Sequence, residues 1–192
     1  MHLSFGLLIE ATWLLWALYW AWGARGVKAA AREDDWTRLL AYRIPVMLGF
    51  ALLIALGQGV GHPWLYRHVP SAAAWAPPLG WLLVLPGLGF ACWARRTLGR
   101  NWSGAVQLKQ DHELIMAGPY RWVRHPIYTG MLLAMLGTIL AAGSWLGLLA
   151  LVLVGGGFWY KLRHEERWMR EQFGTAYVDY MRRVKALVPG VL

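Results

Sequence analysis

The residues best suited to chemistry lie in one run, residues 118–130, which reads Gly-Pro-Tyr-Arg-Trp-Val-Arg-His-Pro-Ile-Tyr-Thr-Gly. Proline disfavours the helical region for the residue before it, so we expect His125 to be extended. Pro126 suits the first turn of a helix, and the free N–H groups of a helix start favour an anion. The run therefore predicts an anion-binding helix start, with His125 and Arg124 beside the anion.

A second polar cluster, residues 161–166, reads Lys-Leu-Arg-His-Glu-Glu and follows another apolar run. Its paired carboxylates, Glu165 and Glu166, suit an ammonium group. The aromatic side chains Tyr120, Trp122 and Tyr128 suit a flat ring or a sulfonium, through stacking and cation–π attraction. A carboxylate, an ammonium, a sulfonium and an adenine together describe S-adenosylmethionine.

The same residues can also be explained by structural roles that involve no ligand. Glu166 and Arg170 are four residues apart and form a surface ion pair if the segment is helical. Arg121 and Arg124 can anchor lipid headgroups, and tyrosine and tryptophan are the usual residues of a membrane interface. The occurrence of the two polar clusters together, each at the end of an apolar run, favours a binding site.

The apolar runs predict an integral membrane protein. The chain has 192 residues, of which 58% are hydrophobic, with 14 tryptophans. Five stretches are apolar over about the length of a transmembrane helix. We therefore predict an all-α bundle of five transmembrane helices, at residues 3–24, 42–61, 77–93, 126–142 and 145–162. Pro86, Gly87 and Gly89 predict a kink or a close helix contact in the third.

The basic residues support this count and predict an orientation. Of the 19 lysines and arginines, all but Arg67 fall in three blocks, residues 25–43, 95–124 and 161–185. Five spans with the N-terminus outside place all three blocks, the C-terminus and the polar clusters on the cytoplasmic face. The net charge of +9 then indicates contact with anionic lipid headgroups rather than with nucleic acid.

The order of the segments predicts how the site is assembled. Only Gly143 and Ser144 separate the last two spans, so these form a hairpin whose far ends are neighbours. The stretch around Val106 and Leu108 alternates and is expected to be extended, while residues 25–43 read as an amphipathic connector. Gly174 is an expected helix end before an amphipathic piece at 176–184. No linker divides the chain: residues 1–94 hold three spans, residues 95–192 the hairpin and tail. The single cysteine offers no disulfide, and no metal site is expected.

Four motifs resemble one known family, the isoprenylcysteine carboxyl methyltransferases, which are related to the phospholipid N-methyltransferases. They are Leu-Gly-Arg-Asn-Trp-Ser from residue 98, His-Glu-Leu-Ile from residue 112, the 118–130 run, and Glu-Glu at 165–166 followed by Phe-Gly-Thr-Ala-Tyr-Val-Asp-Tyr from 173. The resemblance covers about residues 95–189, and the first three spans match only in being apolar.

The resemblance implies a pocket for S-adenosylmethionine at the cytoplasmic ends of the last helices. By position, the cofactor-binding candidates are Gln107, Lys109, His112, Leu114, Ile115, Gly118, Tyr120, His125, Tyr128 and Glu166. The residues implied to face the methyl acceptor are Glu165 and a basic residue, either Lys161 or Arg163, with Arg124 as a further cation for a carboxylate.

The resemblance also implies the reaction, methyl transfer to a lipophilic acceptor that enters from the membrane. The carboxylate of an isoprenylcysteine is the first choice. A phospholipid or another small lipophilic molecule is the alternative acceptor. An amine acceptor would need a base, and Glu165 could serve either chemistry. A non-enzymatic transporter or lipid-binding protein is a more distant rival, because no internal repeat is present and Glu10 is the only acid within a span.

Overall fold

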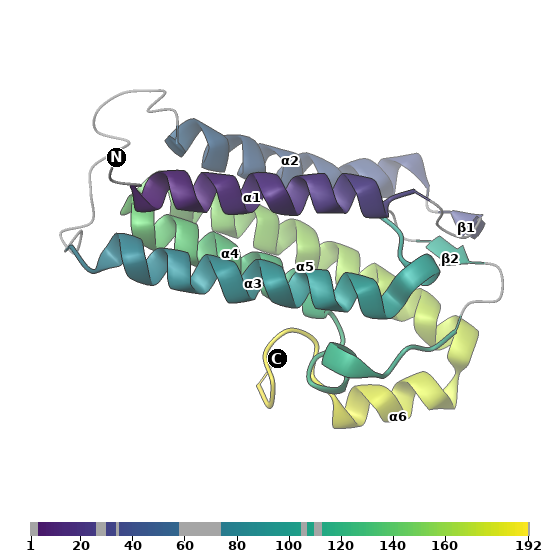
Figure 1. Cartoon of the computed structure of the whole chain (residues 1–192). Helices are drawn as coiled ribbons and strands as arrows, with labels where there is room; N and C mark the ends of the chain where they lie inside the picture. The colour runs from purple at the N-terminus through teal and green to yellow at the C-terminus, as the bar shows by residue number, and fades with distance from the viewer. Residues whose placement is uncertain are drawn as a thin grey trace.

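The computed structural model describes residues 4–25, 30–33, 35–57, 74–104, 107–109 and 113–191. Within these residues, five apolar helices form the body of the protein and run side by side (Figure 1). They are α1 (Phe5–Gly23), α2 (Trp36–Gly57), α3 (Ala76–Leu98), α4 (Pro126–Ala142) and α5 (Trp145–Phe173). The smaller elements are β1 (Ala30–Glu33), η2 (Gly99–Asn101), β2 (Gln107–Lys109), η3 (Gly118–Arg121) and α6 (Thr175–Arg183).

Four of these helices, α1, α2, α3 and α5, are long and apolar enough to cross a membrane. Helix α4 is equally apolar but has 17 residues, a length of about 26 Å against a hydrocarbon core of about 30 Å. The predicted all-helical membrane bundle is confirmed, with four membrane-capable helices in the part of the chain that the structure describes. That α4 is a fifth span stays a prediction.

The two short strands form an antiparallel ribbon at the end of the bundle where α5 turns into α6 (Figure 1). Leu108 pairs with Arg32, and Gln107 pairs with Glu33. The extended form expected near Leu108 is therefore confirmed. The connector between the first two spans, for which the sequence predicted no particular secondary structure, supplies β1, which pairs with residues 107–109.

Close backbone contacts hold α3 against α4. A Cβ atom added at Gly87 would lie 2.7 Å from the backbone oxygen of Gly130, and one added at Gly130 would overlap the oxygen of Gly87. Gly80 and Gly137 repeat this relationship further along the same two helices. Small residues permit such an approach between membrane helices. The close contact predicted around Gly87 is confirmed, and it fixes the helix that begins at the His-Pro step.

Helix α2 packs in a similar way on α5. A Cβ atom added at Gly157 would lie 2.6 Å from Cγ2 of Val46 and 3.0 Å from the backbone oxygen of Tyr42. Lys161 follows Gly157 by one helical turn. The contact therefore brings Tyr42 next to the polar end of α5.

The hairpin between α4 and α5 has the predicted two-residue turn. Gly143 ends α4 with φ 60°, a left-handed conformation that glycine adopts without strain, and the Ser144 side chain accepts a hydrogen bond from the Leu146 N–H (3.2 Å). Helix α5 then continues for 29 residues, well past the expected end of its span at residue 162. Gly174 (φ 54°) ends it, and α6 follows, as predicted.

Candidate active site

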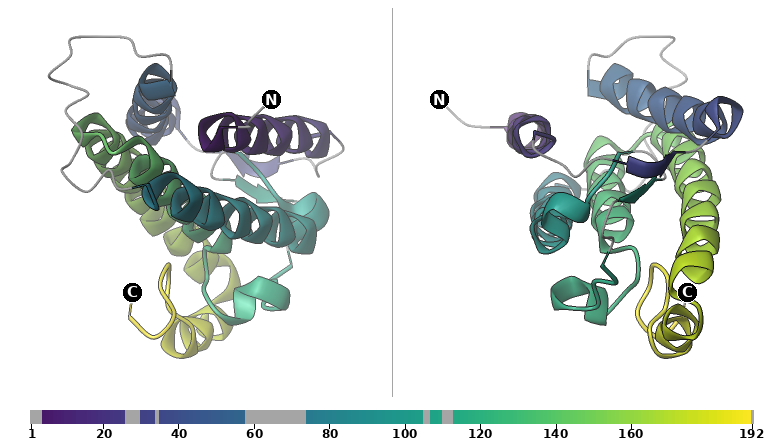
Figure 2. Two further views of the ribbon diagram at one scale, coloured as in Figure 1. Left: turned by 60° about the vertical axis from the view of Figure 1, so that its left-hand side comes forward. Right: turned by 90° about the vertical axis from the view of Figure 1, so that its right-hand side faces the viewer.

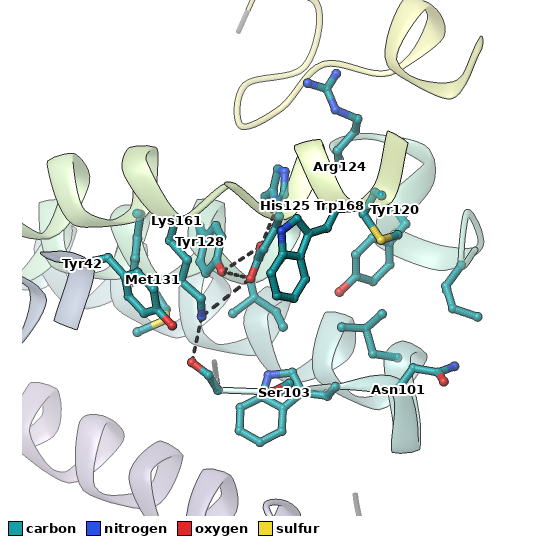
Figure 3. Close-up of a pocket in the computed structure, with 18 of the residues that line it drawn as sticks. Tyr42, Asn101, Ser103, Tyr120, Arg124, His125, Tyr128, Met131, Lys161 and Trp168 are labelled. Atoms are coloured by element: carbon teal, nitrogen blue, oxygen red, sulfur yellow. Dashed lines mark hydrogen bonds and ion pairs between the residues drawn. The ribbon is translucent and has the colours of Figure 1, made fainter. Parts of the chain in front are cut away.

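A cavity of about 480 Å³ opens at the polar end of the bundle (Figure 3). Its walls come from α1 through α6 and from the segments around η2 and η3. Both polar clusters of the sequence contribute to it, the first through the start of α4 and the second through the last third of α5. The predicted convergence of the two ends of the hairpin is therefore present in the structure.

The start of α4 is fixed by the C-terminal segment of the chain. The N–H groups of Arg124 and His125 donate to the carbonyl oxygens of Lys185 (2.8 Å) and Ala186 (3.0 Å). His125 was expected to be extended, but its φ of −123° and ψ of 60° are neither extended nor helical. The backbone bends there because it must pair with Ala186 and then enter α4 at Pro126.

Behind this helix start lies a buried ion-pair group of Arg124, His125 and Glu166. The Nε and Nη2 atoms of Arg124 donate to Oε1 of Glu166 (2.8 and 2.6 Å), and Nε2 of His125 lies 3.1 Å from the same oxygen. Arg124 also donates to the carbonyl oxygen of Val184 and, at 3.4 Å, to that of Met181. Figure 3 shows Arg124 pointing away from the cavity toward the C-terminal segment. Its charge is thus used to hold Glu166 and the tail.

A second group, Lys161, Tyr128 and Glu165, lies in the cavity itself. The Tyr128 hydroxyl donates to Glu165, at 2.9 Å from Oε1 and 3.0 Å from Oε2. The Nζ atom of Lys161 lies 3.7 Å from Oε1 of Glu165 and donates to the carbonyl oxygen of Gly104 (2.9 Å). The same Nζ is 5.4 Å and 5.5 Å from the ring centroids of Tyr42 and Tyr128. The ammonium group is therefore held between two aromatic rings and a carboxylate (Figure 3).

The imidazole of His125 connects the two groups. Its Nδ1 lies 3.6 Å from Oε2 of Glu165, while its Nε2 faces Glu166. The contact with Glu166 is a hydrogen bond, whereas the contact with Glu165 is at ion-pair distance. The His125 and Tyr128 rings are nearly parallel (9°) with centroids 5.5 Å apart, and Tyr128 stacks in turn on Phe158 at 4.6 Å. These three rings form one aromatic wall of the cavity.

Two further tyrosines line the cavity near η3. The Tyr180 hydroxyl donates to the backbone oxygen of Tyr120 (2.6 Å), which ties α6 to η3. Burial raises the pKa of Tyr120 well above its usual value, and the charge of Glu165 adds to the effect. Burial also raises the pKa of Tyr180 to about 12. Both phenols therefore stay protonated near neutral pH and act as neutral hydrogen-bonding groups.

Eight of the fourteen predicted site residues border this cavity, and six do not appear among the residues described in its wall. Glu166 is behind the wall, Gly118 opens η3 with φ 57° beside Thr97, and Arg163 is exposed over the Trp159 ring, 5.7 Å from its centroid. Gln107 and Lys109 belong to strand β2, and His112 lies outside the described residues. The predicted residues that line the cavity are Leu114, Ile115, Tyr120, Arg124, His125, Tyr128, Lys161 and Glu165.

The first two helices contribute residues to the cavity that were not predicted from the sequence. Tyr42 and Arg43 of α2 and Trp20 of α1 line the cavity, as do Trp102 and Trp168. The position of Tyr42 and Arg43 could have been predicted, because they begin a span whose start lies, in the predicted topology, on the same face as the two polar clusters. The position of Trp20 could not, because its run is aromatic throughout.

Comparison with known proteins places the chain in a family. Residues 75–176 match the family model described as phospholipid methyltransferase. The protein-S-isoprenylcysteine O-methyltransferase of Saccharomyces cerevisiae is 34% identical over 114 residues, which cover 58% of this chain and 48% of the yeast protein. Protein-S-isoprenylcysteine O-methyltransferase B of Arabidopsis thaliana is 28% identical over 171 residues, 88% of this chain and 84% of the plant protein.

A solved structure agrees with these sequence matches. The eukaryotic intramembrane Ras methyltransferase, an isoprenylcysteine carboxyl methyltransferase, superposes with a TM-score of 0.56 at 25% identity, over 79% of this chain and 53% of that one. The chain thus spans about half the length of this structure and of the yeast relative. The resemblance inferred from the motifs is confirmed, and the chain is an integral membrane protein that belongs to the phospholipid methyltransferase family.

Proposed function

We propose that this protein transfers a methyl group from S-adenosylmethionine to the carboxylate of a lipophilic, isoprenylcysteine-type acceptor that enters from the membrane. The names of its relatives support the reaction class. The observation that carries the proposal is the Lys161 ammonium, buried in the cavity between the Tyr42 and Tyr128 rings beside Glu165.

The cavity suits the cofactor in size and chemistry. Its volume of about 480 Å³ falls in the range of small-molecule sites, and its walls combine aromatic rings with a few charged groups. Leu114 and Ile115 would border the adenosine, while Tyr120, His125 and the start of α4 would hold the amino-acid end. When bound, the cofactor supplies a methyl group on a positively charged sulfur.

Lys161 is the residue best placed to hold the acceptor carboxylate. Of the other two candidate cations, Arg124 is occupied by Glu166 and by two carbonyl oxygens, and Arg163 lies on the exposed face of α5. A carboxylate that enters the cavity would meet the Lys161 ammonium at the position that faces Glu165. This contact would orient the attacking oxygen.

The physical setting favours methyl transfer to a carboxylate. Bound S-adenosylmethionine would supply its methyl carbon to the acceptor oxygen, and the electron pair of the broken carbon–sulfur bond would stay with sulfur. A cation and an anion become two neutral products, so a site with little water lowers the barrier. An ionised carboxylate needs no base. Alignment of the reacting atoms by Lys161, Tyr128 and Glu165 would then supply most of the acceleration.

An amine acceptor is the second candidate, because the matching family model is that of phospholipid methyltransferases. An amine must lose a proton, and Glu165 would be the base. The nearby Lys161 ammonium repels a protonated amine, which favours the carboxylate. The two are separated by supplying labelled S-adenosylmethionine with either a prenylated cysteine or phosphatidylethanolamine. Label in an ester supports the first, and label in the headgroup overturns it.

We further propose that the cavity and the C-terminus face the cytoplasm and that the N-terminus lies outside. The basic residues Arg43, Arg95 and Lys161 all stand at the polar end of their helices, where the cavity opens. Labelling of single cysteines in intact cells tests this, with Cys92 first replaced. A cysteine at residue 171 should resist a membrane-impermeant reagent until the cells are opened.

A further inference from the structure

A second cavity, of about 280 Å³, lies on the other side of the Arg124–Glu166 pair. It is bounded by the outer face of α5 and by the segment that follows α6. This segment turns back from the end of α6 (Figure 2). The segment after α6 is held in place because the carbonyl oxygens of Lys185 and Ala186 accept hydrogen bonds from the backbone just before α4. The residues that determine its charge and its apolar border are Trp159, Arg163, Glu166, Lys185 and Val191.

The charge of this second cavity is positive. Among the lining residues that the structure describes, Glu166 is the only acid, and Arg124 and His125 already hold that carboxylate at 2.6 Å and 3.1 Å. The remaining cations, Arg163 and Lys185, have exposed side chains on two elements that face each other across the space. Two cations with no opposing free acid in the cavity wall suit an anion with several oxygens, such as a phosphate.

The second cavity also stands at the level of a membrane surface. The apolar part of α5 ends at Tyr160, and Lys161 is the first charged residue after it. Trp159, which borders the cavity, is 41% exposed, and Val191 on the opposite side is 76% exposed. Tryptophan next to a basic residue is typical of the headgroup region. The anion at this position would therefore carry acyl chains that continue along the apolar face of α5.

We propose that this second cavity binds the phosphate of an anionic phospholipid, with Arg163 and Lys185 as its ligands. The site is separate from the methyl-transfer cavity, since the Arg124–Glu166 pair and α5 stand between them. The lipid bound here is not the methyl acceptor, and the inference does not depend on the proposed reaction. It also gives a role to Arg163, which the first cavity does not use.

The test measures lipid retention by the full-length protein in detergent, with native mass spectrometry and added phosphatidylglycerol or phosphatidylcholine. The wild type should retain phosphatidylglycerol in preference to phosphatidylcholine. The double variant Arg163→Gln/Lys185→Gln should bind phosphatidylglycerol about thirtyfold more weakly, the loss expected for two basic residues near a lipid surface. The matched control is Arg96→Gln/Arg167→Gln, which removes the same charge from exposed positions outside the cavity.

Three outcomes would overturn the proposal. The first is unchanged phosphatidylglycerol binding by the Arg163→Gln/Lys185→Gln variant. The second is an equal loss in the control variant, which would mean that overall charge attracts the lipid. The third is displacement of the lipid by millimolar inorganic phosphate, which would identify a site for free phosphate. Equal melting profiles of the variants, followed by circular dichroism, show that each comparison is made on folded protein.

Discussion

The Nζ atom of Lys161 lies 3.7 Å from Oε1 of Glu165, one helical turn further along α5, and both side chains face the same cavity. The Tyr128 hydroxyl bridges both oxygens of that carboxylate. The pair therefore neutralises itself while the cavity holds no anion. An acceptor carboxylate that binds Lys161 would share the ammonium with Glu165, so each of the two residues has a distinct expected effect on turnover.

Replacing Lys161 with methionine should weaken acceptor binding and spare the cofactor. The side chain keeps its length but loses the charge that we propose as the partner of the carboxylate, a change of about 1–3 kcal/mol, which corresponds to roughly fivefold to 150-fold in KM for the acceptor. The measurement is steady-state methyl transfer with a prenylated cysteine. Arg163→Met is the matched control, since Arg163 points away from the cavity, and an equal rise in its KM would contradict the assignment.

Replacing Glu165 with glutamine should abolish turnover while much of the cofactor affinity remains. The amide keeps the shape of the side chain and its oxygen can still accept from Tyr128, but the negative charge that orients Lys161 is lost. The expected loss in kcat is at least about a hundredfold, the scale for a group that positions a reacting atom. Binding of S-adenosylhomocysteine, measured by calorimetry, provides the control. Unchanged kcat would remove Glu165 from the mechanism.

Replacing His125 with alanine should weaken binding of S-adenosylhomocysteine by about 1–3 kcal/mol, the scale for losing a partner of a charged group. The change removes both the ring that stacks on Tyr128 and the group that lies between Glu165 and Glu166. Calorimetry on detergent-purified protein makes the measurement. Equal affinity in the variant would mean that the cofactor does not bind at the start of α4.

The sequence was sufficient for the parts of the site that depend on local rules. The His-Pro step predicts a helix start at Pro126, and the Gly143–Ser144 pair predicts the hairpin that brings this start next to Glu165. The sequence also favours Lys161 over Arg163 as the cation for the acceptor carboxylate. Only Lys161 is four residues from Glu165 and so shares its face of the helix. Which face of α5 borders the cavity depends on Gly157 and its contact with α2.

Other parts depend on contacts between distant segments. The bend at His125 comes from the hydrogen bond that its N–H donates to the carbonyl oxygen of Ala186, near the far end of the chain. Nothing in the apolar run of the second span indicates that Tyr42 meets Lys161. Likewise, the sequence suggests that Arg124 binds a ligand. In the fold, its guanidinium group is instead bound to Glu166 and to the carbonyl oxygen of Val184.

The glycine contact between α3 and α4 makes a stability prediction. Gly130→Val should lower the apparent melting temperature strongly, because a Cβ atom there would overlap the backbone oxygen of Gly87 and push α4 away from α3. Gly156→Val is the matched control: an added Cβ at Gly156 meets no atom within 4 Å in the described structure. A thermal shift assay compares the two. Equal melting temperatures would mean that α3 and α4 do not pack through this seam.

The buried pair of Arg124 and Glu166 makes the last prediction. Arg124→Met leaves the Glu166 carboxylate, whose side chain is 5% exposed, without its main partner and frees the carbonyl oxygen of Val184. Breaking a buried pair in this way costs about 3–5 kcal/mol, whereas replacing both partners by apolar residues is far less damaging. Arg124→Met should therefore expose the tail after α6 to proteolysis and lower the melting temperature. The double variant Arg124→Met/Glu166→Leu should recover most of the melting temperature, although cofactor binding stays weak because His125 has lost Glu166. If the double variant is no more stable than the single one, Arg124 acts through the tail alone and not through Glu166.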